Sequence, residues 1–211
     1  MLIYAIILLA VITRFVPHMP NFAPITALAI FSGANLGWKK SVGLTLAVRF
    51  ISDIFLGFFS WPLMLAVYAS HLVGVLFGLW IKNSNHPVTL RVTPLLDRRG
   101  SSADNLGGSA ELSSFLRRST PRSGGRWLEQ WTKIIFSSLG ASLIFFFITN
   151  FAFLYGNYPH NISGIILAYT NGLPFFRGTL FGDLGYTAAL FGAYQFALYG
   201  KSISQPKRAT A

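Results

Sequence analysis

The chain contains no cysteine. This absence excludes structural disulfides, thiolate metal sites and cysteine nucleophiles. Charged side chains are also scarce, because they make up only 11% of the 211 residues, roughly half the share of an average soluble domain. Acidic residues are the rarest of them, with six Asp and Glu against 17 Lys and Arg. A soluble domain with a densely charged surface is therefore not expected.

Recognisable catalytic motifs are missing as well. The sequence has no HExxH, no glycine-rich phosphate loop followed by Lys, and no Gly-x-Ser-x-Gly elbow. His18 and His160 could bind a metal ion together with a carboxylate, but their spacing along the chain is uninformative. We therefore predict that the chain is not an enzyme and that it holds no metal and no cofactor.

Apolar residues are what the chain has in abundance, at 53% hydrophobic and 16% aromatic. They fall in segments long enough to be helices in a membrane, separated by turns that contain Gly, Trp or Pro. This pattern predicts an all-α polytopic membrane protein with about six transmembrane helices. The expected helices cover residues 1–16, 24–37, 41–59, 62–81, 132–155 and 179–199.

The composition divides the chain into four parts. Residues 1–81 hold the first four predicted helices, and residues 82–131 are rich in Ser, Arg, Gly and Pro, which predicts a polar, basic and disordered cytoplasmic loop. Residues 132–200 hold the last two helices, with an outer loop from Gly156 to Arg177 that contains a re-entrant piece too short to span. Residues 201–211 form a polar basic tail.

The net charge of +11 could indicate a nucleic-acid partner, but its distribution favours a membrane. Almost all the excess of Lys and Arg lies in the turn at 38–41, the loop at 82–132 and the C-terminal tail. In a six-helix arrangement these segments lie on one side, which the positive-inside rule makes cytoplasmic, with both termini. We expect the lipid bilayer as a partner, and no nucleic acid.

Polar side chains gather at the opposite, outer level of the predicted bundle. Charged groups at membrane depth are costly and normally face a cavity or a partner, so their convergence predicts an outward-facing pocket for a small molecule. Tyr158, Asn171 and the loop at Pro174 would act as its lid. The predicted binding residues are Arg14, His18, Asn21, Asp53, Asn150, Asn171 and Asp183.

Structural roles remain open for several of these residues. Arg49 and Asp53 are four residues apart, on one face of a helix, and can form a buried bridge with no substrate contact. Asp183 near a helix start could instead stabilise the helix dipole. Arg14 could extend to the interface, and His71 in the middle of a helix is expected to hydrogen-bond a neighbouring helix.

The string PHMPNFAPITALA at 17–29, followed by Ser52-Asp53 and Gly57, resembles a family of small bacterial inner-membrane proteins of unassigned function. That family in turn looks, more remotely, like the substrate-binding S components of energy-coupling factor vitamin transporters. Together the matching segments span roughly three quarters of the chain. The further segments that carry the match are FITNF at 147–151, GLPFF at 172–176 and GDL at 182–184.

This resemblance implies an S-component-like bundle in the bacterial inner membrane and a vitamin-like solute captured from the outer face. It also implies docking onto a transmembrane coupling subunit driven by two ATPases. Ala29, Gly33 and Gly37, spaced every four residues, are the nearest candidates for the docking face. The family usually joins the fourth and fifth helices by a short connection, whereas this chain has some fifty polar residues there. The alternative function is a structural or assembly subunit of a larger membrane complex, without a ligand of its own.

Overall fold

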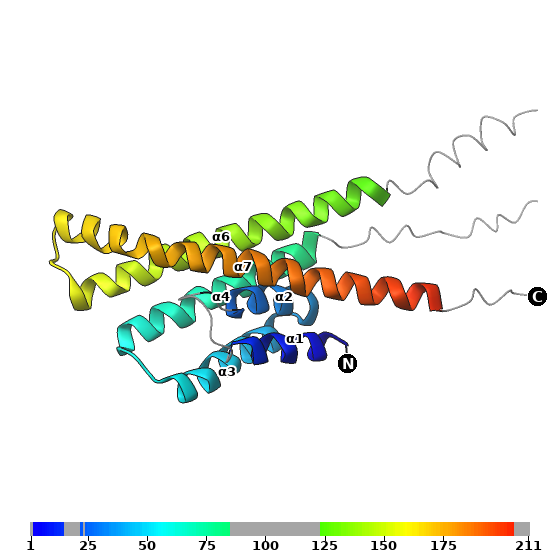
Figure 1. Ribbon diagram of the computed structural model, residues 1–211, viewed down its shortest axis with the longest axis horizontal. Coiled ribbons are helices and arrows are strands. Elements are labelled where there is room, and N and C mark those ends of the chain that lie inside the picture. Colours follow the sequence, from blue (N-terminus) through cyan, green and yellow to red (C-terminus); the bar gives the residue numbers. More distant parts are fainter. Residues whose placement is uncertain (1, 15–21, 23, 85–122, 205–211) are drawn as a thin grey trace, which may run out of the picture.

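The computed structural model describes residues 2–14, 22, 24–84 and 123–204. Every regular element in these residues is helical, which confirms the all-α prediction for this part of the chain (Figure 1). The predicted site residues His18 and Asn21, most of the 82–131 segment and most of the basic tail lie outside it. The helices are α1 (Leu2–Thr13), α2 (Ile25–Leu36), α3 (Trp38–Leu56), α4 (Trp61–Ser84), α6 (Ser123–Asn157) and α7 (Ile162–Ser204).

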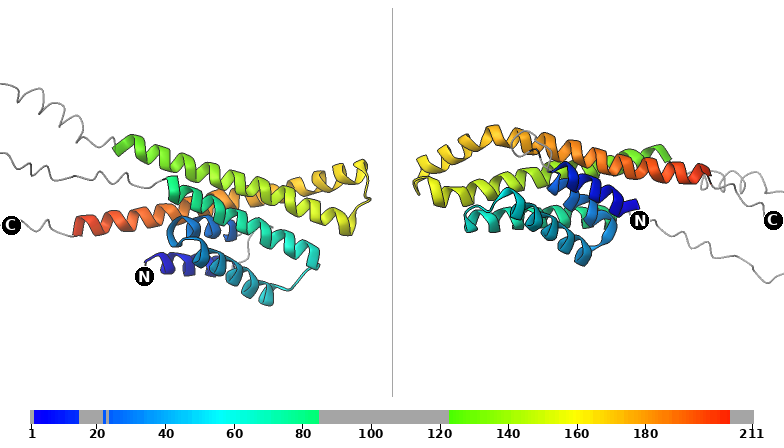
Figure 2. Two further views of the ribbon diagram at one scale, coloured as in Figure 1. Left: turned by 180° about the vertical axis from the view of Figure 1, so that it is seen from behind. Right: turned by 60° about the horizontal axis from the view of Figure 1, so that its bottom comes forward.

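Consecutive helices alternate in direction along a common long axis (Figure 1). The start of α1, the end of α4, the start of α6 and the end of α7 point toward one end of the molecule, whereas the α3–α4 and α6–α7 turns lie at the other (Figures 1 and 2). The antiparallel pair of α6 and α7 is much longer than the other helices and extends past them at both ends. The two turns therefore lie at the same end of the molecule, with the α6–α7 turn projecting farther out.

Helix α2 is the centre of the packing, because every residue from Ile25 to Gly33 is buried. Its Phe31 ring meets α7, with ring centroids 5.2 Å from Phe191 and 5.7 Å from Tyr194. Most of the remaining surface of α2 is covered by α4. A helix that is buried on every face in this way requires neighbours on all sides.

Small residues let α2 and α4 approach closely. A Cβ atom placed on Gly33 would lie 3.0 Å from the Cα of Gly78, and one on Gly74 would lie 3.1 Å from the Cβ of Ala29. The close approach predicted from the small-residue spacing is thus present, within a single chain. Ala29 and Gly33 are covered by α4, so docking of a partner through them and Gly37 stays a prediction that would require α2 and α4 to separate.

Two helix boundaries on α3 differ from the prediction. The segment from Trp38 to Lys40, expected as a turn, is the first turn of α3. The connection from α2 takes a single residue, because Gly37 has a φ of 82°, a backbone conformation that glycine adopts without a steric penalty. Gly57, with a φ of 97°, ends the same helix.

The largest difference concerns the outer loop predicted from Gly156 to Arg177. Most of this stretch belongs to α7, a continuous helix with Pro174 inside it, and only residues 158–161 connect it to α6. Asn161 starts the helix by accepting a hydrogen bond from the Gly164 N–H at 2.8 Å. The predicted re-entrant loop was therefore wrong.

Packing against α6 explains why the helix continues through its proline. The ring of Phe146 on α6 lies 4.8 Å from Phe176 and 5.7 Å from Tyr169, which flank Pro174 on α7. Proline removes one backbone hydrogen bond, and a neighbouring helix in a membrane bundle can offset that loss. The breaking signals in the sequence were outweighed by aromatic contacts that only the tertiary structure supplies.

Two described helices are long and apolar enough to cross a membrane, over Trp61–Ser84 and Trp127–Phe151. Helices α1 and α2 are apolar but have only 12 residues each. Helix lengths therefore support two spans rather than the six predicted.

We predict opposite effects for one substitution made at two glycines. Gly78→Ala should lower the free energy of unfolding by about 1–3 kcal/mol, because the added Cβ overpacks the interface with α2. Gly185→Ala should raise it by about 0.5–1 kcal/mol, since that helical glycine has no atom within 4 Å of an added Cβ. Denaturant titration in detergent measures both, and equal effects would contradict the close packing of α2 and α4.

Candidate functional site

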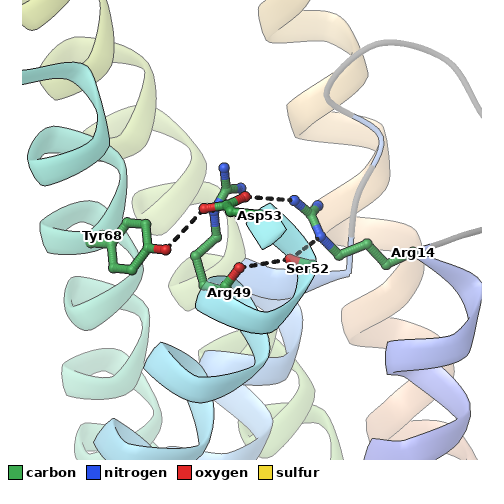
Figure 3. A network of polar contacts seen from close by, with 5 residues as sticks. All are labelled: Arg14, Arg49, Ser52, Asp53 and Tyr68. Carbon is green, nitrogen blue, oxygen red and sulfur yellow. Dashed lines mark hydrogen bonds and ion pairs between the residues drawn. The ribbon is translucent and has the colours of Figure 1, made fainter. Parts of the chain in front are cut away.

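A buried carboxylate shared by two arginines lies where α1, α3 and α4 meet (Figure 3). Asp53 Oδ2 is 2.9 Å from Arg49 Nε and also accepts a hydrogen bond from the Tyr68 hydroxyl at 2.9 Å. Asp53 Oδ1 is 3.7 Å from Arg14 Nη2. One side chain on α3 thus connects the end of α1 to α4.

Ser52 makes the network more rigid. Its Oγ accepts a hydrogen bond from Arg14 Nε at 2.8 Å and donates one to the Arg49 carbonyl at 2.8 Å. The backbone N–H of Arg14 bonds to the Val11 carbonyl at 3.1 Å. Arg14 is therefore fixed at both its backbone and its guanidinium, rather than extended into an interface.

The charges in this network do not balance. The side chains of Arg14, Arg49 and Asp53 are only 8%, 13% and 2% exposed, so water screens them weakly. Two guanidinium groups surround one carboxylate, which leaves one positive charge in excess. Of the two arginines, Arg49 is the one that lines a cavity. Its guanidinium carbon lies 5.5 Å from the Phe59 ring centroid and 5.9 Å from that of Tyr68.

A cavity of about 530 Å³ lies beside this network, between α4, α6, α7 and the α3–α4 turn. Its volume is within the range of small-molecule sites. The walls are mainly apolar, and six of the 15 lining residues are aromatic. The lining residues are Arg49, Phe59, Leu63, Val67, Phe145, Phe146, Thr149, Asn150, Tyr158, Ala168, Asn171, Gly172, Phe175, Phe176 and Thr179.

The polar lining groups are positioned by hydrogen bonds. Asn150 Nδ2 donates to the Phe146 carbonyl at 2.8 Å, and Asn171 Nδ2 donates to the Tyr158 hydroxyl at 3.2 Å. The latter bond links α7 to the α6–α7 turn at the end of the cavity. A Cβ on Gly172 would collide with the Asn150 amide, so a larger residue at 172 would displace that side chain.

The structure brings part of the predicted site together. Asn150 and Asn171 line the cavity, while Asp53 and Arg14 lie behind Arg49 and do not line it. Arg49, for which the sequence left a structural bridge to Asp53 and a substrate contact both open, is the charged residue of the wall. The residues of α7 that line the cavity include a helical stripe at 168, 172, 175 and 179, which becomes recognisable only once this segment is known to be a helix.

Asp183 occupies a different place. It lies deep within α7, far from the helix start at Ile162, and its carboxylate accepts a hydrogen bond from Ser142 on α6 at 2.7 Å. Thr26 on α2 is a further hydrogen-bonding neighbour. The side chain is 2% exposed and does not line the cavity. The helix-dipole explanation fails as well, because Asp183 is several turns away from the N-terminus of its helix.

His71 on α4 is buried and lies against Phe145, with ring centroids 5.5 Å apart. Among the described residues neither of its ring nitrogens has a hydrogen-bond partner, so the predicted interhelical bond is not seen there. No three His, Asp or Glu side chains in the described part of the chain come together as metal ligands. The candidate site therefore consists of the cavity and the Arg49 side chain that lines it.

Comparison with known proteins identifies a family but no characterised relative. A model described as a family of unknown function (DUF6580) matches residues 1–96 and 119–206. No curated protein and no solved structure matches the chain. The two matched segments include all six described helices and leave out part of the polar segment between α4 and α6.

Asp53 and Tyr68 should contribute unequally to the free energy of unfolding. Asp53→Ala leaves two buried guanidinium groups without a counter-charge and should lower the free energy of unfolding by about 3–5 kcal/mol. Tyr68→Phe removes one hydrogen bond to a charged group and should cost about 1.5–3 kcal/mol. Thermal and denaturant unfolding of the two variants in detergent tests the order, and a stable Asp53→Ala protein would disprove it.

Proposed function

The chain belongs to the family of unknown function DUF6580, and we propose that it is a membrane-embedded subunit that captures a small molecule for transport. The observation that carries the proposal is the cavity of about 530 Å³ beside the partly buried Arg49. Apolar and aromatic walls with a few fixed polar groups are typical of small-molecule sites. Because no reaction is assigned to this chain, the energy for transport would come from partner subunits.

The membrane location is supported by the surface of the helices. Large apolar side chains are exposed on several helices, among them Phe55, Phe136, Phe181 and Phe196, at 73%, 66%, 64% and 79%. A soluble monomer rarely exposes extensive apolar surface. Lipid would cover these side chains.

We further propose that all six helices lie across the bilayer, with both turns at the outer side. The alternating directions of the helices (Figure 1) support this topology, as do Lys82 in the last turn of α4 and Lys201 near the end of α7. Helix α2, with 12 residues, would reach only about 18 Å, but it is enclosed by other helices and does not need to face lipid along its whole length.

In this arrangement the cavity opens toward the outer side, where Phe59 and Tyr158 come from the two turns. The hydrogen bond between Asn171 and Tyr158 would be the contact that changes when solute enters. It replaces the loop at Pro174, which is helical, as the proposed lid. Docking onto a coupling subunit with ATPases, as in the S components that the sequence resembles, would complete the transport cycle.

Purified protein should retain a small molecule that native mass spectrometry detects. Asn171→Ala should weaken its retention by about tenfold or more, because a hydrogen-bonding group at the cavity wall is lost. Thr170→Ala is the matched control, since Thr170 is exposed and does not line the cavity. Protein that retains nothing, and is stabilised by no small molecule, would favour the structural-subunit alternative.

The topology predicts which positions a membrane-impermeant maleimide reaches in intact cells. The chain has no cysteine, so each introduced thiol reports alone. Ser60→Cys, in the α3–α4 turn, should be labelled from outside, whereas Ser84→Cys, at the end of α4, should react only after permeabilisation. Labelling of both in intact cells, or of neither, would contradict six spans with the turns outside.

A further inference from the structure

We propose that the cavity takes an organic monoanion, a carboxylate attached to a flat aromatic body. This inference rests on the proposed small-molecule function and names the chemical class of the ligand. It is carried by the position of Arg49, by the charges around it and by the aromatic rings that line the space.

The cavity wall carries a positive charge. Arg49 is the only charged residue among the described residues that line the cavity. Behind it, Asp53 is shared with Arg14, so one carboxylate faces two guanidinium groups. An anion in the cavity would supply the missing negative charge, whereas a cationic ligand would add a third positive charge in a place that water screens weakly.

Arg49 has N–H donors besides the one that Asp53 takes. Asp53 takes the Nε hydrogen, and Tyr68 is a further hydrogen-bonding neighbour of Arg49. A guanidinium has five N–H donors in a planar fork that matches a carboxylate in two-point contact. The remaining N–H groups of Arg49 can therefore donate hydrogen bonds to a ligand carboxylate without breaking the bond to Asp53.

The orientation of Arg49 is fixed before any ligand arrives. Asp53 holds its Nε, and the rings of Phe59 and Tyr68 lie near its guanidinium carbon. Tyr68 is itself bonded to Asp53. Asp53 and Tyr68 are thus positioning residues, which reduce the conformational entropy that Arg49 would lose on binding.

The aromatic side chains that line the cavity favour a flat apolar ligand. Four Phe side chains of α6 and α7 line the cavity, and the tilted contact of Phe146 with Phe176 has ring centroids 4.8 Å apart. Aromatic faces favour flat rings through offset or edge contacts. Asn150 and Asn171 supply uncharged polar contacts elsewhere on the wall. Together these features select a ring system with one acidic group.

The test uses three probes that share one ring system and differ in charge: naphthoate, naphthamide and naphthylmethylamine. Their affinities for the full chain in detergent are measured by thermal shift and by isothermal titration. Naphthoate should bind about tenfold or more tightly than the amide, because its charge is met by Arg49. The amine should bind more weakly than the amide.

Substitutions then show which residue causes the preference for naphthoate. Arg49→Gln should remove the preference for naphthoate while leaving Asp53 paired with Arg14, and Arg49→Lys should restore part of it. Arg177→Gln makes the same change on an exposed residue of α7 that does not line the cavity, so it should keep the preference. Far-UV circular dichroism confirms that each variant is folded.

The outcomes separate this inference from the function on which it rests. Naphthamide binding as tightly as naphthoate, or a preference that survives Arg49→Gln, would overturn the anion assignment and leave small-molecule capture standing. Oleate binding more tightly than naphthoate through Arg49 would show a lipid carboxylate and overturn the aromatic part. No binding of any probe, together with no retained molecule, would reject both proposals.

Discussion

The shared carboxylate of Asp53 is the interaction on which the rest of the site depends. A charge buried this deeply is tolerated only with a partner, and Asp53 has two guanidinium groups and a tyrosine hydroxyl. The same contacts join α1, α3 and α4, so the element positions and the charge arrangement are fixed together. Asp53 contacts side chains from three segments of the chain, and Arg49 lies between Asp53 and the cavity.

Close packing along the second half of α4 is accompanied by open space beside its first half, on the same face of the helix. Glycines at 74 and 78 bring α4 against α2, whose residues from Ile25 to Gly33 are buried, while Leu63 and Val67 line the cavity with α6 and α7. On α7 the large aromatic side chains that follow Asn171 form the opposite wall. The cavity therefore lies near the two short turns, where bulky residues meet, and the small-residue contact with α2 lies farther along α4.

Asp183 illustrates how a second buried acid can be independent of the first. Its bond to Ser142 joins α6 to α7, and Thr26 adds a contact from α2. Hydroxyl partners satisfy its oxygens without an arginine, in contrast to Asp53. The two intramembrane carboxylates of the proposed topology therefore have different surroundings, and only one of them is next to the cavity.

The sequence by itself determined the helical class, the small-residue contact and the presence of polar groups at the end of the bundle where Asn150 and Asn171 line the cavity. These features depend on local composition and on residue spacing, which periodicity reports directly. It could not determine that α7 passes through Pro174, that Arg49 rather than Asp53 lines the cavity, or that Asp183 lies elsewhere. Those outcomes depend on contacts between residues far apart in the chain, such as Phe146 with Phe176 and Arg14 with Asp53. Only the tertiary structure decides them, because the free energy of packing and charge pairing outweighs the local preference of a single proline or the helical position of a single acid.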